Sequence, residues 1–220
     1  MQNYKCKIVK WSDIEKWTKG LVKKMISSGF RPEIVVGLTR GGWVPARLIC
    51  DHLGIKNLYA VKTEHWGITA TRTGNAVLAQ PLCVDIKGKD VLIVDDITDT
   101  GQSLKLAIEH IKGLEPKTLK SATLLHIDHS MIVPDFYYVH VPKEDWTWFV
   151  FPWNFNEDIR TLVKKVLEDS KEAVAEKKVR TLLKNRFQIN VEPYKIKVAL
   201  NELKMNDAVR KEKEGWITAK

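Results

Sequence analysis

Short apolar runs alternate with segments of helical periodicity through the first 155 residues of the chain. The apolar runs are rich in β-branched residues and predict buried strands, while apolar residues three and four positions apart predict helices at residues 11–25, 44–53 and from 104 onward. Alternating strands and helices are typical of a parallel sheet covered by helices on both faces. The pattern therefore predicts an α/β fold, doubly wound, with a mainly parallel five-stranded sheet whose strands lie at residues 34–38, 58–61, 91–94, 122–127 and 136–141.

Two segments depart from this alternation. Residues 66–81 contain several threonines and a central Thr-Gly-Asn, which predicts a hood at about residues 64–84, either a flexible flap that closes over a site or a passive surface hairpin. The pattern from about 156 to 187 is helical and highly charged, and another helix and a short hairpin at about 208–218 follow it. Helix, helix and hairpin is the coarse order of a winged-helix module, although a dimerisation or capping appendage is the favoured interpretation.

The composition is that of a folded protein, and its charge is unevenly distributed. Hydrophobic residues make up 44% of the chain, and the net charge of +9 is compatible with a nucleic acid, an anionic substrate or a lysine-rich surface. Residues 161–220 hold 15 Lys or Arg against 9 Asp or Glu, a net charge of +6, which leaves +3 for the first 160 residues. We therefore expect a core domain over residues 1–160 and a basic, mostly helical C-terminal extension over residues 161–220.

The sequence favours a cytoplasmic protein that does not contact a membrane. The amino-terminal residues lack the apolar core of a signal peptide, and no apolar run approaches the length of about 18 residues that spans a bilayer. The three cysteines are widely spaced and form no Cys-X-X-Cys pair. Neither a disulfide framework nor a structural zinc site is therefore expected.

Candidate chemistry follows the strand at residues 91–94. Asp95 and Asp96 come where this buried strand surfaces, and two adjacent carboxylates there are expected to face a divalent cation or hydroxyl groups. The next residues, Asp-Thr-Gly-Gln-Ser at 99–103, offer hydroxyls and a permissive glycine just before a helix, whose amides can cradle a phosphate. Open α/β sheets bind ligands at this edge. An Asp-Asp pair also occurs in metal-binding receiver domains, and a strand, turn and helix is often only a capped helix start.

A second polar loop follows the first core strand. Thr39, Arg40, Gly41 and Gly42 place a hydroxyl, a guanidinium and two small residues at the same predicted edge of the sheet. Arginine grips phosphate oxygens with two hydrogen bonds, and glycines let main-chain amides approach them, so the loop suits a diphosphate. Arg-Gly-Gly is also common in ordinary turns.

The whole string Val-Leu-Ile-Val-Asp-Asp-Ile-Thr-Asp-Thr-Gly-Gln-Ser-Leu at 91–104 resembles the phosphoribosyl diphosphate (PRPP) motif of the type I phosphoribosyltransferases. Residues 134–142 and 146–160 resemble the carboxyl-terminal part of the 6-oxopurine enzymes of that family, and the resemblance covers roughly residues 30–160. It implies the type I phosphoribosyltransferase fold with its hood, and transfer of 5-phosphoribosyl from PRPP to N9 of hypoxanthine, guanine or xanthine in purine salvage. Pyrophosphate and a nucleoside monophosphate would be the products.

The resemblance also implies roles for individual residues. Asp99 matches the catalytic acid-base residue, and the family often has a non-proline cis peptide where this chain has Thr39-Arg40. Mg²⁺ is the implied cofactor, with Asp95 and Asp96 close to the metal, and a homodimer or homotetramer is expected. The remaining implied contacts are to the ribose and 5-phosphate (Asp95, Asp96, Asp99, Thr100, Gly101, Gln102, Ser103), to pyrophosphate (Thr39, Arg40, Gly41, Arg160) and to the purine (Ile127, Trp148, Phe149, Asn154).

One departure from the family pattern concerns the base. A lysine at the end of the fourth core strand usually donates to the purine 6-oxo group, and alignment places Ile127 there, with His126, Asp128 and His129 as neighbouring polar residues. A transferase for adenine or a pyrimidine base therefore remains an alternative. A regulator that senses PRPP and binds nucleic acid through the basic tail is another, although a nucleic-acid partner is not favoured because Asp99, Arg40 and the hood are all present.

Overall fold

The computed structural model describes residues 4–65, 76–170 and 172–219. The chain separates into two compact units, each described by itself below. One unit is Trp11–Trp146, and the other combines the described part of Met1–Lys10 with Thr147–Lys220. The compact units divide after Trp146, whereas the sequence predicts a core domain that ends at Arg160. The boundary between this core domain and a C-terminal extension stays a prediction. None of the helices among the described residues is long and apolar enough to cross a membrane.

The unit Trp11–Trp146 is built on a sheet that is parallel except at one edge. Within the described part of the chain its strand order is β4-β3-β2-β5-β6-β7, and β4 alone runs antiparallel to its neighbour β3. The parallel strands are β2 (Ile34–Thr39), β3 (Leu58–His65), β5 (Asp90–Thr98), β6 (Thr118–Ile127) and β7 (Phe136–Val141), and β4 is Ala76–Gln80. The predicted α/β fold class and its five parallel strands are confirmed.

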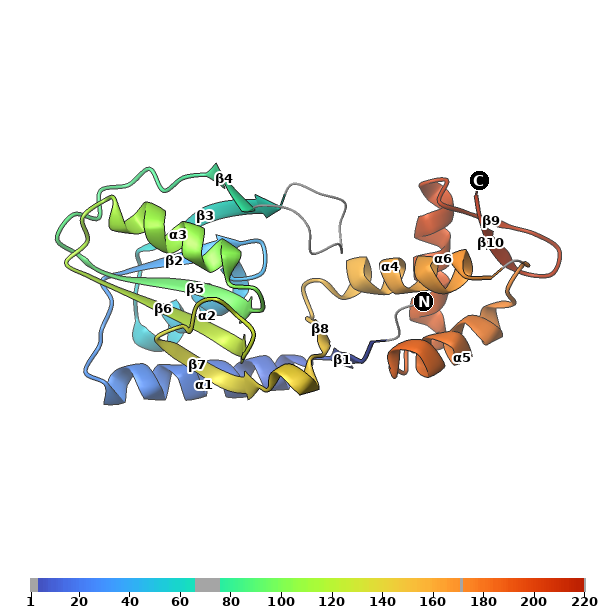
Figure 1. Ribbon diagram of the computed structural model, residues 1–220, viewed down its shortest axis with the longest axis horizontal. Helices are drawn as coiled ribbons and strands as arrows, with labels where there is room; N and C mark the ends of the chain where they lie inside the picture. The colour runs from blue at the N-terminus through green and yellow to red at the C-terminus, as the bar shows by residue number, and fades with distance from the viewer. Residues whose placement is uncertain (1–3, 66–75, 171, 220) are drawn as a thin grey trace. The chain divides into compact units, whose positions relative to one another are not determined.

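Helices cover both faces of this sheet (Figure 1). The helices α1 (Trp11–Ser27) and α2 (Trp43–Leu53) lie on one face and α3 (Gln102–Lys112) on the other, and a short 3-10 helix, η1, spans Lys143–Asp145. Helix α3 buries Leu104, Ala107 and Ile111, whose spacing of three and four places them on one side. The central strands β2 and β5 are apolar because both of their faces are covered, and Val91 to Val94 are fully buried.

The sixth strand belongs to the predicted hood. Strand β3 is longer than its sequence pattern predicts because its end pairs with β4, in register Thr63 with Leu78 and Glu64 with Val77. These two strands form the stem of a hairpin. The predicted hood continues through residues 66–75, which lie outside the described residues, so its role as a lid stays a prediction.

The second unit consists mainly of helices. Strand β1 (Cys6–Ile8) pairs in parallel with β8 (Trp148–Val150), and the chain continues through α4 (Phe155–Glu168), α5 (Glu176–Phe187), α6 (Pro193–Met205), β9 (Val209–Lys211) and β10 (Trp216–Thr218). Strands β9 and β10 form an antiparallel hairpin. The predicted helices and terminal hairpin are confirmed, whereas the sequence does not predict β1 or β8, because strands of three residues are too short to show a period.

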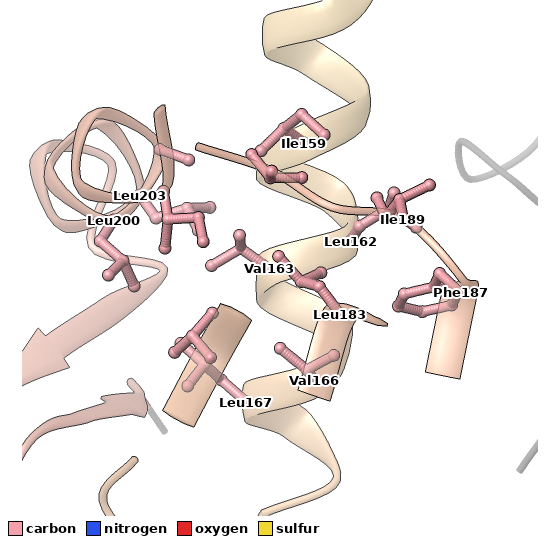
Figure 2. Packing of buried hydrophobic residues seen from close by; sticks show 14 of the residues in the cluster. Ile159, Leu162, Val163, Val166, Leu167, Leu183, Phe187, Ile189, Leu200 and Leu203 are labelled. Carbon is pink, nitrogen blue, oxygen red and sulfur yellow. The ribbon is translucent and has the colours of Figure 1, made fainter. Parts of the chain in front are cut away.

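The helices of this unit share one apolar core (Figure 2). Leu162, Val163 and Val166 of α4 point toward Leu183 and Phe187 of α5, and α6 contributes Leu200 and Leu203. Burying one aliphatic or aromatic side chain of this size stabilises a fold by roughly 1.5–3 kcal/mol. The helices after residue 155 therefore form a packed body rather than a set of solvated charged segments.

Candidate active site

Two adjacent carboxylates end the central strand β5. Asp95 is half-buried and Asp96 is buried, with 7% of its surface exposed. The Asp96 amide donates a hydrogen bond to Asp95 Oδ1 at 2.9 Å. Burial, and then the negative charge of Asp96, raises the pKa of Asp95 well above the usual range of an aspartate. The pair is an electrostatically unfavourable arrangement that a cation or several hydroxyl donors would relieve.

Because burial and the charge of Asp96 both disfavour an ionised Asp95, replacing Asp95 by a neutral residue should stabilise the fold. Because the pKa is higher in the folded chain than in the unfolded chain, the folded state loses stability as the pH rises above the usual carboxyl range. Asp95→Asn should therefore raise the melting temperature of the ligand-free protein at about pH 8, and the gain should shrink toward about pH 3, where the carboxyl is largely protonated in both states. Thermal unfolding at the two pH values measures it, with Asp51→Asn on the exposed face of α2 as the control. An unchanged or lower melting temperature at the higher pH would contradict the assignment.

The loop after β2 lies directly against this acid pair. A Cβ built on Gly41 would lie 2.1 Å from Asp96 Oδ2, and one on Gly42 would lie 2.3 Å from the Val94 carbonyl oxygen and 2.7 Å from Asp95 Cα. Both glycines are therefore required by the close approach of two loops. The peptide bond between Thr39 and Arg40 is cis, as predicted. The structure thus brings the predicted pyrophosphate loop and the predicted ribose carboxylates together at one edge of the sheet.

The loop from β5 to α3 supplies main-chain amides at the same edge. Gly101 precedes α3 with a φ of 81°, a left-handed conformation that favours glycine, and it has no side chain of its own to cap the helix start. The Gln102 amide donates to Thr100 Oγ1 at 3.4 Å. The first amides of a helix have no partner within the helix and carry the positive end of its dipole, so they bind phosphate well.

The loop after β6 folds back onto the loop from β5 to α3. The Met131 amide donates to the Thr100 carbonyl oxygen at 3.1 Å, and a Cβ on Gly101 would lie 2.5 Å from Ser130 Oγ. The same fold-back places His129 Nε2 2.5 Å from Asp99 Oδ1. Trp146 Nε1 donates to that oxygen at 3.3 Å. Asp99 is thus held from two sides, and the contacts of His129 and Trp146 with it are features that no sequence signal predicts.

The remaining predicted site residues lie on other elements of the structure. Ile127 ends β6 and is almost completely buried, at 1% exposed. Trp148 and Phe149 lie on β8, and Asn154 precedes α4, so these residues belong to the other compact unit. Arg160, also in that unit, forms an ion pair with Glu202, with Nη1 2.6 Å from Oε2. The roles of these residues toward a base or pyrophosphate stay predictions.

The acid pair, the Arg-Gly-Gly loop and the start of α3 thus lie at the carboxyl edge of a mainly parallel sheet, where proteins of the α/β class bind their ligands. Comparison with known proteins identifies the family. The phosphoribosyl transferase domain matches residues 7–160, and the chain belongs to this family. The predicted family, type I phosphoribosyltransferases, is confirmed.

Named relatives and solved structures agree with this. The chain is 27% identical to xanthine-guanine phosphoribosyltransferase of Cereibacter sphaeroides over 151 residues, which cover 66% of this chain and 85% of the relative. It is 31% identical to hypoxanthine-guanine phosphoribosyltransferase of Aquifex aeolicus over 121 residues, 54% of this chain and 68% of the relative. The crystal structure of a purine phosphoribosyltransferase from Pyrococcus horikoshii is 31% identical, with a TM-score of 0.58 over 67% of this chain and 92% of that chain.

Proposed function

We propose that the protein is a purine phosphoribosyltransferase that transfers 5-phosphoribosyl from PRPP to N9 of a 6-oxopurine and releases pyrophosphate. The observation that carries the proposal is the packing of Gly41 and Gly42 against Asp96 and Asp95, beside the amide-lined turn at Thr100. A donor with phosphates at both ends of a sugar matches two phosphate-binding loops on either side of a carboxylate pair. The relatives named for xanthine, guanine and hypoxanthine support the purine acceptor.

The donor set at the sheet edge fits magnesium. No cluster of three or more His, Cys, Asp or Glu side chains suited to a metal occurs among the described residues. Mg²⁺ is commonly held by one or two carboxylates together with substrate phosphates and water. A cation beside Asp95 would offset the repulsion from Asp96 that helps to raise the pKa of Asp95. Asp95 and Asp96 would hold the ion and the ribose hydroxyls. When bound, magnesium would neutralise charge on the departing pyrophosphate.

The residues of the chain would divide the remaining work. The bond that breaks joins C1 of the ribose to a pyrophosphate oxygen, and positive charge grows on the ribose ring, as in glycoside hydrolysis. Arg40 in the cis-peptide loop would stabilise the leaving oxygens. Asp99 would accept the proton that leaves N7 as N9 attacks, and its contacts with His129 and Trp146 hold its carboxylate in place for that step. Thr100 to Ser103 would enclose the 5-phosphate.

The residues of the site indicate the phosphoribosyl donor more directly than the base that accepts the phosphoribosyl group. The side chain of Ile127, at the position where the family usually has a lysine, has no group that can donate to a 6-oxo atom. Trp148 would stack on the purine, and Phe149 would offer its backbone to the base edge. Transfer to adenine or a pyrimidine is the second candidate, and the missing lysine is the observation that favours it.

A product assay tests the proposal and separates the two candidates. The full chain is incubated with PRPP, Mg²⁺ and, one at a time, hypoxanthine, guanine, xanthine, adenine, uracil and orotate, and nucleotides are separated by chromatography. We expect nucleoside monophosphate and an equal amount of pyrophosphate with at least one of the three 6-oxopurines. Product with adenine, uracil or orotate alone would contradict the proposed acceptor, and no product with any base would contradict the proposed reaction.

A homodimer or homotetramer and a cytoplasmic location stay predictions.

A further inference from the structure

The C-terminal part of the chain, most of which lies beyond the matched family domain, has a topology of its own. Helix α4 is followed by a bridge residue, Val174, then by α5, α6, β9 and β10. Val174 pairs antiparallel with Trp216 of β10, its amide and carbonyl exchanging hydrogen bonds of 2.8 and 2.9 Å with Trp216. Among the described residues of 155–219, the order of this module is thus helix, bridge residue, helix, helix, strand, turn, strand, with Val174 at the place of the first strand. This is the complete order of a winged helix, in which α5 and α6 form a helix-turn-helix.

We propose that this winged-helix module binds double-stranded DNA, with α6 in the major groove. The sequence alone does not favour a nucleic-acid partner, because Asp99, Arg40 and the hood are all present. The structure adds the pairing of Val174 with Trp216, which leaves no periodic signal in the sequence. The inference does not depend on the transferase activity proposed above. It stands on the topology of the module and on the side chains that α6 exposes.

Helix α6 divides its side chains between core and solvent. Its buried residues, Ile196, Ala199, Leu200 and Leu203, all belong to the core of the unit (Figure 2 labels the two leucines). Its exposed residues share the opposite side of the helix and mix cationic, amide and apolar groups: Tyr194, Lys197, Val198, Asn201, Lys204 and Met205. Within the described residues, Lys197 and Lys204 form no ion pair, and no acidic side chain lies in this stripe. The nearby Glu202 points its carboxylate at Arg160.

These residue types are suited to reading duplex DNA. Lysine ammonium groups neutralise backbone phosphates or bind guanine edges, and asparagine binds adenine through two hydrogen bonds. Val198 and Met205, which are 42% and 82% exposed, offer apolar contact to thymine methyl groups. An α-helix fits the width of the major groove, so one stripe presents phosphate-binding and base-reading groups together.

The turn before α6 and the wing after it (β9, β10 and the turn between them) both contact other parts of the module. Ile189 and Val191 of the turn are buried, and Arg180 of α5 donates to Asn190 Oδ1 at 3.0 Å, which fixes the position of α6 relative to α5. In the wing, a Cβ on Gly215 would lie 2.4 Å from backbone atoms of Val174, so the hairpin is pressed against the bridge. The wing exposes Lys213, beside Arg210, which pairs with Glu212.

Binding of the full chain to duplex DNA tests the proposal. The probe is a fluorescent duplex of random sequence, about 30 base pairs long, and the measurement is anisotropy across a salt series. We expect binding with a dissociation constant of about 10⁻⁶–10⁻⁴ M at physiological salt, weakening as salt rises. The double variant Lys197→Gln with Lys204→Gln should bind about tenfold more weakly, and its plot of log affinity against log salt should be shallower by about 1.8, for two lost phosphate contacts.

A matched control removes the same charge elsewhere. Lys16→Gln with Lys23→Gln alters two exposed lysines of α1 that form no ion pair within the described ranges, and it should leave DNA binding nearly unchanged. Selection from a random duplex pool should enrich a common motif with the wild type, and Asn201→Ala should lose it while retaining non-specific binding. An equal loss in the α1 control would overturn the proposal, because binding would then follow net charge. Absence of binding at low salt, or preference for single-stranded RNA over the duplex, would overturn it too.

Discussion

Asp99→Asn is expected to lower turnover by about two to four orders of magnitude, the usual contribution of a general base. Asparagine has the size of aspartate, and its carbonyl oxygen can keep the hydrogen bond from Trp146 Nε1. It cannot accept the proton that N7 of the base must lose. The turnover number should therefore fall while the dissociation constant for PRPP stays close to that of the wild type. Steady-state release of pyrophosphate and calorimetric titration with PRPP measure the two quantities separately.

The matched control for this change is Asp85→Asn. Asp85 is an exposed aspartate of the same compact unit, where it accepts a hydrogen bond from the Lys87 amide at 3.0 Å. It lies outside the predicted site, so turnover should stay at the wild-type value. Wild-type turnover in Asp99→Asn would remove the role assigned to Asp99. A variant that fails to bind PRPP would show instead that Asp99 holds the donor.

The second large effect is expected at Gly42. Its Cβ would meet the Val94 carbonyl oxygen, Asp95 Cα and the Leu38 carbonyl oxygen at 2.3, 2.7 and 2.8 Å, and all three are backbone atoms that cannot rotate away. Gly42→Ala must therefore push the loop and the end of β5 apart. We expect a loss of about 1–3 kcal/mol in the free energy of unfolding, as for other overpacked sites. Activity should be lost as well, because the same shift separates the pyrophosphate loop from the acid pair.

Gly113→Ala is the control for the alanine change. Gly113 ends α3 with a φ of −64°, and its nearest contact to an added Cβ would be the His110 carbonyl oxygen at 3.3 Å. Chemical denaturation and pyrophosphate release should both stay near wild type in this variant. If Gly42→Ala kept wild-type stability and activity, the two loops would not be packed as closely as described, and the site assembled from them would be wrong.

Short-range patterns explain why much of the fold, and the shared sheet edge of the candidate donor residues, could be predicted. The strand, acid pair and turn from Val91 to Leu104 are contiguous, so the sequence itself carries their order and spacing. Strands β2 and β5 are parallel neighbours, so their carboxyl ends necessarily reach one edge. The predicted cis peptide at Thr39-Arg40 rests on the family resemblance and is confirmed.

Features that depend on long-range packing could not be predicted. The contact between His129 and Asp99 arises because the loop after β6 turns back to bond Thr100, and no residue pattern records that turn. The pairing of β1 with β8 joins two segments that lie far apart in the sequence, each too short for a periodic signal. The family resemblance implies that Arg160 contacts pyrophosphate. Its ion pair with Glu202 of α6 could not be predicted from that resemblance, because Glu202 lies beyond the matched domain.

A crystal structure of the full chain with PRPP and Mg²⁺ tests the central claim most directly. The account predicts electron density for the donor at the carboxyl edge of the sheet, with pyrophosphate at Arg40 and Gly41, the ribose hydroxyls at Asp95 and Asp96, and the 5-phosphate on the amides after Thr100. Donor density at any other place, or crystals that take up no PRPP at saturating concentration, would contradict it.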